Sequence, residues 1–456
     1  MIEQKRLADF LGTVVLVLMI ACHDLFYVTL VLWLLLAIIC LRNPKFAIHS
    51  VFFFSSFFMS SNFFQNPLVT VKHFHLALAI LFFVSMIQWK QTLDNVKKNW
   101  RASLILIFWM ALIAISAFSL LRVSDGFGQN FRTTGNLLLT VLCAWLFFLL
   151  IKKEDVIPGL GFLVFGTCVR AFLSILFLWQ ISGPYLEEAV LYNNHLGFYF
   201  SMALLCFLSF IAVIKNRFLK QFSIAAFFFL FYVFLLTGSR TGYVGFFGGL
   251  VSFTIIQKWL QKKRFSGGVP RTIWLILSSI FLGSVLILLV AGYLFPDGYI
   301  FPIISSRLWM TLNLFTPSQW KIALSDKQNF GFLGYYRLEQ FQVLGEILKQ
   351  HPVLGIGLVK QVTNFHSLYL MFLGATGLTG LITFLFFCVS WMRRMFHGMV
   401  SDDGNGNLFR MALMSCMVCW LCYSIAESFF LQFNIWIMIV SGIALSKSVL
   451  FERKLV

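Results

Sequence analysis

The sequence has few acidic residues and little charge of either sign. Only 17 of its 456 residues are Asp or Glu, and charged residues make up 11% of the chain. Hydrophobic residues reach 60%, and 56 of them are phenylalanine. Water-soluble domains do not expose apolar surface on this scale. This chain has too few polar residues to shield its apolar residues from water. The composition therefore excludes a soluble enzyme and indicates a membrane protein.

Long polar segments are also scarce. Successive apolar runs approach the roughly 20 residues that cross a bilayer as a helix, which predicts an all-α polytopic membrane protein with about 12–14 transmembrane helices. We expect residues 1–295 to hold the first eleven helices, residues 296–362 to form one large external loop, and residues 363–456 to add the C-terminal helices. The predicted architecture is one integrated membrane domain.

The external loop contains one segment with helical periodicity. Four apolar side chains recur at helical spacing between Tyr336 and Gln350, namely Leu338, Phe341, Leu344 and Leu348. This pattern predicts an amphipathic helix that lies on the bundle with this stripe inward and ends at His351-Pro352.

The formal charge of +18 comes from 35 Lys and Arg residues. These basic residues collect in alternate turns, for example Lys90 to Arg101 and Lys258 to Arg271. Cytoplasmic loops of membrane proteins show this excess, so it predicts a multi-pass protein of the cytoplasmic (inner) membrane with both termini in the cytoplasm. Membrane lipids, and no nucleic acid, are the partners that this charge implies.

Disulfide and metal signatures are missing from the loops. All nine cysteines lie in or at the edge of apolar segments, so we expect no disulfide framework. Cys416, Cys419 and Cys422 recur every third residue without a His or acidic partner, which favours helix packing over a metal site. The sequence predicts no metal and no cofactor.

Three polar residues stand out in the segments that this topology places outside. Arg240 lies in a Gly-flanked turn between two apolar helices, where it either binds an anion or extends to lipid headgroups. Arg337 opens the amphipathic helix and has no partner at helical spacing, since Glu339 is only two residues away. His366 occurs with other polar residues where the loop re-enters the membrane, and such groups converge on cavities.

Two further charges fall within apolar segments. Arg170 lies deep in one predicted helix and Glu427 lies near the outer end of another. Either residue lines a substrate cavity or forms a buried ion pair between helices, and the sequence leaves both readings open.

The second half of the chain resembles the O-antigen ligase and polymerase superfamily. The run from Arg337 through His351-Pro352-Val353-Leu354-Gly355-Ile356-Gly357 and His366-Ser367-Leu368-Tyr369 to Gly374, Gly377 and Gly380 resembles the family's C-terminal signature. The turn Thr237-Gly238-Ser239-Arg240 resembles the family's arginine before its long external loop. Asn193-Asn194-His195-Leu196-Gly197 looks like the polar start of an earlier family helix.

The resemblance implies a membrane glycosyltransferase that moves a glycan from undecaprenyl diphosphate to an acceptor hydroxyl at the outer face of the membrane, in lipopolysaccharide biosynthesis. Arg240 and Arg337 would hold the diphosphate oxygens, and His366 would deprotonate or orient the acceptor hydroxyl. We expect five further residues to bind substrate: Ser239, Asn193, Asn194, Arg170 and Tyr369. The acceptor is then a lipid A core or another glycan, and no nucleotide sugar is needed.

Two alternatives stay open. A surface-polysaccharide or O-antigen polymerase has the same chemistry but uses a second lipid-linked repeat unit as acceptor, and the histidine at position 366 favours the ligase type. A lipid-linked oligosaccharide flippase or transporter would be equally basic and apolar. Repeated halves and matched pairs of broken helices, which are typical of transporters, are not visible in the sequence.

Overall fold

The computed structural model describes most of the predicted bundle. The residues that it describes are 2–21, 26–55, 62–65, 70–88, 114–115, 127–180, 194–237, 239–262, 331–358, 362, 365, 367–401, 406–425 and 433–446. The predicted helix count stays a prediction, because several apolar segments fall outside these ranges.

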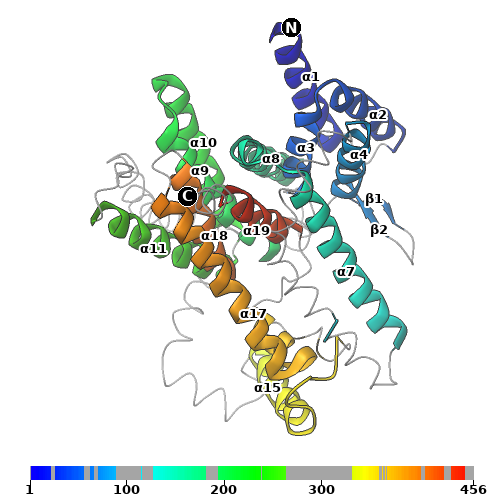
Figure 1. Cartoon of the computed structure of the whole chain (residues 1–456), viewed down its shortest axis with the longest axis vertical. Coiled ribbons are helices and arrows are strands. Elements are labelled where there is room, and N and C mark those ends of the chain that lie inside the picture. The colour runs from blue at the N-terminus through cyan, green and yellow to red at the C-terminus, as the bar shows by residue number, and fades with distance from the viewer. Residues whose placement is uncertain are drawn as a thin grey trace, which may run out of the picture.

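The described chain is a bundle of helices (Figure 1). In chain order the helices are α1 (Ile2–Ala21), α2 (Phe26–Arg42), α3 (Pro44–Ser55), α4 (His73–Ile87), α7 (Phe127–Leu150), α8 (Lys153–Gln180), α9 (Asn194–Val213), α10 (Arg217–Leu236), α11 (Arg240–Lys262), α15 (Gly331–Gln350), α17 (Leu368–Ser401), α18 (Gly406–Tyr423) and α19 (Phe433–Leu445). Two short antiparallel strands, β1 (Asn62–Gln65) and β2 (Thr70–Lys72), precede α4.

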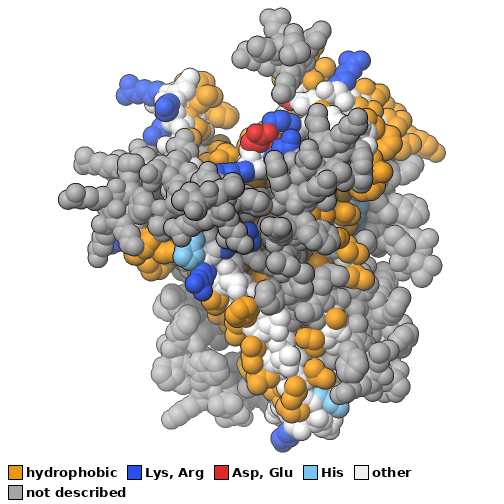
Figure 2. Space-filling view, viewed as in Figure 1, with side chains coloured by type: hydrophobic (Ala, Val, Ile, Leu, Met, Phe, Trp, Pro, Cys, Tyr) orange, Lys and Arg blue, Asp and Glu red, His pale blue; other side chains and the backbone are white. Residues whose placement is uncertain are grey.

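The helices have the length and surface that a bilayer requires. Within the described residues, five segments are long and apolar enough to cross a membrane: 153–175, 196–213, 217–235, 368–399 and 406–423. Apolar side chains are exposed along outward faces, such as Val244, Phe247, Val251 and Ile255 of α11. Figure 2 shows such side chains over much of the visible described surface. The protein is therefore an all-α polytopic membrane protein, as predicted.

Small residues allow α9, α11 and α18 to pack closely at the centre. A Cβ placed on Gly245 of α11 would lie 3.0 Å from the Cys419 carbonyl oxygen, and one on Gly249 would lie 3.0 Å from that of Ser415. On an adjacent face of α18, the sulfur of Cys416 lies 3.9 Å from that of Cys206 in α9. Cys416 and Cys419 thus serve helix packing, which confirms the interpretation drawn from their spacing.

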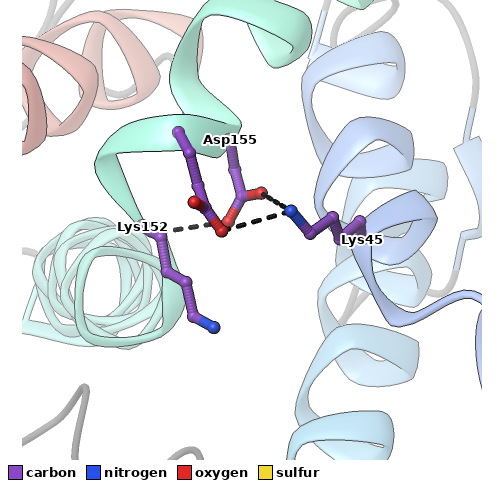
Figure 3. A network of polar contacts seen from close by, with 4 residues as sticks. Lys45, Lys152 and Asp155 are labelled. Carbon is purple, nitrogen blue, oxygen red and sulfur yellow. Dashed lines mark hydrogen bonds and ion pairs between the residues drawn. The ribbon is translucent and has the colours of Figure 1, made fainter.

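The N-terminal helices join the centre through α8. In α8 Gly159 would place a Cβ 2.3 Å from the Phe52 ring of α3, so only a glycine fits there. Lys45 at the start of α3 donates a 3.1 Å hydrogen bond to Glu154 and lies 3.8 Å from Asp155, both in the first turn of α8 (Figure 3). The bond to Glu154 raises the pKa of Lys45. Because Lys45 and Glu154 are half exposed or more, their pairing adds little stability.

One end of the bundle is held by buried polar contacts. Arg410 at the start of α18 is fully buried and donates to the Leu445 carbonyl of α19 at 2.7 Å and to Asn407 at 2.8 Å. Asn407 in turn donates to the Met399 carbonyl near the end of α17 at 3.1 Å. Carbonyl groups in the last turns of α17 and α19, which have no N–H partner within their own helices, therefore receive hydrogen bonds from α18.

Helix α15 forms in the predicted external loop and ends at Gln350, directly before His351-Pro352, as predicted. Its buried face differs from the predicted stripe. Leu344 is buried, but Phe341 is 59% exposed, and Gln340 and Ile347 are buried instead. Inclusion of Phe341 in the inward stripe was wrong, because the i, i+3 and i, i+4 spacings are satisfied equally by the neighbouring face with Gln340, Leu344 and Ile347.

Candidate functional site

Helices α9 and α11 begin side by side at the end of the bundle opposite Arg410. A Cβ on Gly242 would lie 3.1 Å from the Cα of Gly197, and the Ser201 hydroxyl of α9 lies 3.2 Å from the Gly242 carbonyl oxygen of α11. Farther along, Gly249 meets Leu205, so the two helices run parallel. Two helix N-termini, each with a partial positive charge from its aligned backbone dipoles, therefore lie together.

The start of α11 is fixed by its own turn. The Ser239 Oγ accepts a 3.0 Å hydrogen bond from the Gly242 N–H, which is the geometry of a helix N-cap, and Ser239 is 1% exposed. The Thr237 hydroxyl donates to the Phe234 carbonyl at 2.7 Å and closes the end of α10. Ser239, which the sequence suggested as a substrate ligand, thus has a structural task that sets the backbone direction at Arg240.

The predicted catalytic residues fall at the edge of what the structure describes. Arg240 is the first residue of α11 and Arg337 lies in α15, and for both the structure describes the backbone alone. Asn194 is the first residue of α9, also described by its backbone. His366 and Asn193 lie outside the described residues, although Phe365 and Ser367 on either side of His366 lie within them.

The segment after His366 is bonded to the end of α18. The Leu368 N–H donates to the Ser424 carbonyl at 3.0 Å, and the Ser367 hydroxyl donates to the same oxygen at 3.3 Å. The Tyr369 hydroxyl donates to the Leu421 carbonyl at 2.9 Å. The three bonds join the segment to the C-terminal end of α18, one to Leu421 in the last turn and two to Ser424, the residue directly after the helix. The Tyr369 hydroxyl therefore donates its hydrogen bond to the backbone of the protein itself.

The end of α18 also meets the starts of α9 and α11. The rings of Tyr423 and Phe198 are 5.0 Å apart, and a Cβ on Gly245 would lie 3.4 Å from the Cβ of Tyr423. Because Tyr423 directly precedes Ser424, the segment from Ser367 to Tyr369 is bonded to the same helix end that packs against α9 and α11.

Helix α17 is broken at Gly377, where φ is 61° and ψ is −161°. The two parts fold back on each other, since the rings of Phe372 and Phe384 are stacked 4.7 Å apart. Twelve residues of unbroken α-helix would separate them by about 18 Å along the axis. Helix α17 therefore consists of a short helix of residues 368–376, a sharp turn, and a long helix from residue 378.

The chain after α15 crosses this break and pairs with both broken ends. The N–H groups of Ile356 and Gly357 donate to the carbonyls of Gly374 and Ala375 at 3.0 and 2.8 Å. In the other direction, the N–H groups of Leu378 and Thr379 donate to Pro352 and Val353 at 2.9 and 3.2 Å. The backbone groups freed by the break thus find partners in one loop, as burial demands.

Glycines make this crossing possible. A Cβ on Gly377 would lie 2.4 Å from the Val353 carbonyl, and one on Gly355 would lie 2.4 Å from the Gly374 oxygen. Both residues also have positive φ, where other residues are strained. The glycines of the sequence signature therefore build the support on which α15, and with it Arg337, is attached to α17; Figure 1 shows α17 reaching past α18 to α15.

Arg170 lies apart from these contacts, on the opposite side of α9. It is 7% exposed, and its Cζ lies 5.9 Å from the ring centre of Tyr199. Sequence reasoning missed Tyr199, as it missed the anchoring role of Ser367 and Ser424. A tyrosine or serine in an apolar helix has no sequence signal that separates a ligand from a packed side chain.

The two adjacent helix N-termini suit an anionic ligand. Two adjacent helix N-termini attract negative charge without any metal ion. Within the described residues, His, Cys, Asp and Glu form no group of three that could hold a metal ion.

Comparison with known families gives one match. Residues 225–385, roughly a third of the chain, match the family model described as O-antigen ligase. The matched range contains Arg240, Arg337 and His366 together with the broken helix and its crossing loop, whereas Arg170, Asn193 and Asn194 lie before it. No curated protein matches the chain.

Proposed function

We propose that this chain, whose residues 225–385 match the O-antigen ligase family model, is a membrane glycosyltransferase that transfers a glycan from undecaprenyl diphosphate to an acceptor hydroxyl at the outer face of the inner membrane. The supporting observation is the contact of Gly197 with Gly242, which joins the N-termini of α9 and α11. Arg240 begins one of these helices and Asn194 begins the other.

The donor's diphosphate binds at these two N-termini in this proposal. The aligned backbone dipoles of the two helices favour an anion there, and Arg240 adds a guanidinium that binds phosphate oxygens in a bidentate manner. The diphosphate is also the leaving group, so the same contacts stabilise the charge that builds up as the glycosidic bond breaks. Arg337 adds the second guanidinium from α15.

His366 acts as the base in this proposal. It takes the proton of the acceptor hydroxyl, whose oxygen attacks the anomeric carbon while the bond to the diphosphate oxygen breaks. The bonds of Ser367 and Tyr369 to the C-terminal end of α18 hold this segment against the helix end that packs on α9 and α11. Ser367 and Tyr369 are therefore positioning residues, and Ser239 positions Arg240 as an N-cap.

The basic turns orient the molecule in this proposal. With Lys45 and Arg410 at the cytoplasmic end, the starts of α9 and α11 lie at the outer side, where lipid-linked glycans are displayed. The ligase type has a lipid A core as acceptor. A polymerase would use the same donor site with a second lipid-linked glycan as acceptor.

The test measures donor binding and glycan transfer separately, with purified protein in detergent and an undecaprenyl-diphosphate-linked glycan. Arg240→Ala and Arg337→Ala are expected to weaken donor binding, and His366→Ala to bind donor but form no product. Arg217→Ala and His397→Ala are the matched controls, because both residues are exposed at the other end of the bundle. Transfer by all three site variants at the wild-type rate would refute the assignment of these residues, and donor binding without any transfer by the wild type would favour a transporter.

A further inference from the structure

Arg170 of α8 and Tyr199 of α9 form a buried polar pair. Arg170 is 7% exposed and Tyr199 is 3% exposed. The guanidinium carbon lies 5.9 Å from the centre of the tyrosine ring, within range of a cation–π contact. In that contact the guanidinium lies over the face of the ring, and the phenol hydroxyl takes no part in it.

The Tyr199 hydroxyl is buried without a hydrogen-bond partner in the part of the chain that the structure describes. A buried hydroxyl that has lost its water and found no other partner destabilises the fold. Phenylalanine would fill the same space without that loss, and this chain uses phenylalanine at 56 positions. The Tyr199 hydroxyl is therefore available to a ligand that binds beside Arg170.

The position of the pair connects it to the proposed donor site. Successive residues of an α-helix are about 100° apart, so Tyr199 faces away from Gly197, which packs on α11. Tyr199 lies five residues after the first residue of α9, a rise of about 7.5 Å. Arg170 and Arg240 thus flank the beginning of α9 from opposite sides.

We propose that Arg170 and Tyr199 bind an anionic oxygen ligand, a phosphate or carboxylate group, on the α8 side of α9. Both side chains can donate hydrogen bonds and the guanidinium is cationic, so an anionic oxygen matches the pair. Resting on the proposed function, the anion belongs either to the diphosphate of the donor or to a charged group of the acceptor. The pair lies outside the residues that match the family.

The experiment uses Tyr199→Phe, which removes only the hydroxyl, and Arg170→Gln. Tyr232→Phe is the matched control, because Tyr232 of α10 is 42% exposed, so the variant removes a hydroxyl from the surface of the bundle instead of one buried between helices. For each protein in detergent, the Tm of the ligand-free form is measured first. Binding of undecaprenyl diphosphate follows, and then binding of inorganic phosphate in the presence of saturating undecaprenyl diphosphate.

Tyr199→Phe is expected to raise the ligand-free Tm by roughly 1–3 °C, since an unsatisfied buried hydroxyl is removed. Tyr199→Phe should weaken the binding of one probe about tenfold or more, because one hydrogen bond to a charged group is lost. Weaker binding of undecaprenyl diphosphate assigns the pair to the donor, and weaker binding of phosphate alone assigns it to a separate anion on the acceptor side.

The proposal is overturned if Tyr199→Phe and Arg170→Gln bind both probes like the wild type, whatever their Tm. Its failure is distinct from failure of the proposed function. If wild-type protein does not bind undecaprenyl diphosphate but binds phosphate through Arg170 and Tyr199, the donor site is refuted and the anion site stands.

Discussion

Gly197 and Gly242 meet where α9 and α11 begin, and Ser239 occupies the space that a side chain on either glycine would need. A Cβ on Gly242 would lie 3.1 Å from the Gly197 Cα, and one on Gly197 would lie 2.5 Å from the Ser239 Cβ. This contact aligns the two helix N-termini and buries the N-cap of α11. Both the stability of the bundle and the proposed donor site therefore depend on the absence of a side chain at Gly197 and Gly242.

Gly197→Ala is expected to destabilise the protein by roughly 1–3 kcal/mol, because the added methyl overlaps Ser239 and forces the helices apart. It should also weaken donor binding, since the helix starts separate. Thermal unfolding and donor titration check both effects. Gly345→Ala is the control, because nothing lies within 4 Å of a Cβ at this position in α15. An equal loss in Gly345→Ala would contradict the packing argument.

Gly377→Ala should disrupt the crossing of α17 by the loop after α15. The φ of 61° is strained for alanine, and the new Cβ would lie 2.4 Å from the Val353 carbonyl. Backbone strain of this kind costs roughly 1–3 kcal/mol before the overlap is counted. Thermal unfolding measures the loss, and protease sensitivity of α15 shows whether the loop detaches. Wild-type values in both measurements would mean that the broken helix is not needed.

Tyr369→Phe is expected to lower kcat about tenfold with little change in donor affinity, since one hydrogen bond to α18 is lost while the ring stays. Ser367→Ala should act similarly, and Ser367→Thr should restore activity because it keeps the hydroxyl. The pH profile of kcat is the decisive readout, since a displaced base changes it and a general loss of stability does not. Ser415→Ala is the control, because the Ser415 hydroxyl donates to the Met411 carbonyl within α18 and does not bond the segment after His366.

Arg410→Met is expected to cost roughly 1–3 kcal/mol of stability, because the Leu445 carbonyl and Asn407 lose their donors in a buried place. Activity per folded molecule should stay at the wild-type level, since Arg410 lies at the end of the bundle opposite the candidate site. Arg393→Met, at an exposed position of α17, should change neither quantity. A Tm equal to that of the wild type would show that the buried arginine adds nothing to the net stability.

The sequence by itself determined the class of the protein and the identity of its candidate residues. Apolar runs must lie in lipid, and the composition alone requires this. The signature around His366 and the turn at Arg240 were visible because glycines, charges and a histidine interrupt apolar sequence. The helix in the external loop followed from its periodicity, although the spacing did not identify which of two overlapping faces is buried, and Phe341 proved exposed.

Only the tertiary structure decided how these elements meet. The break at Gly377, the fold-back that stacks Phe372 on Phe384, and the loop that pairs with both broken ends depend on contacts between residues far apart in the chain. The pairing of Arg170 with Tyr199 depends on how α8 packs on α9. Apolar helices in lipid lack a strong sequence code for their neighbours, because lipid solvates every apolar face equally well and close packing of small residues selects the partner.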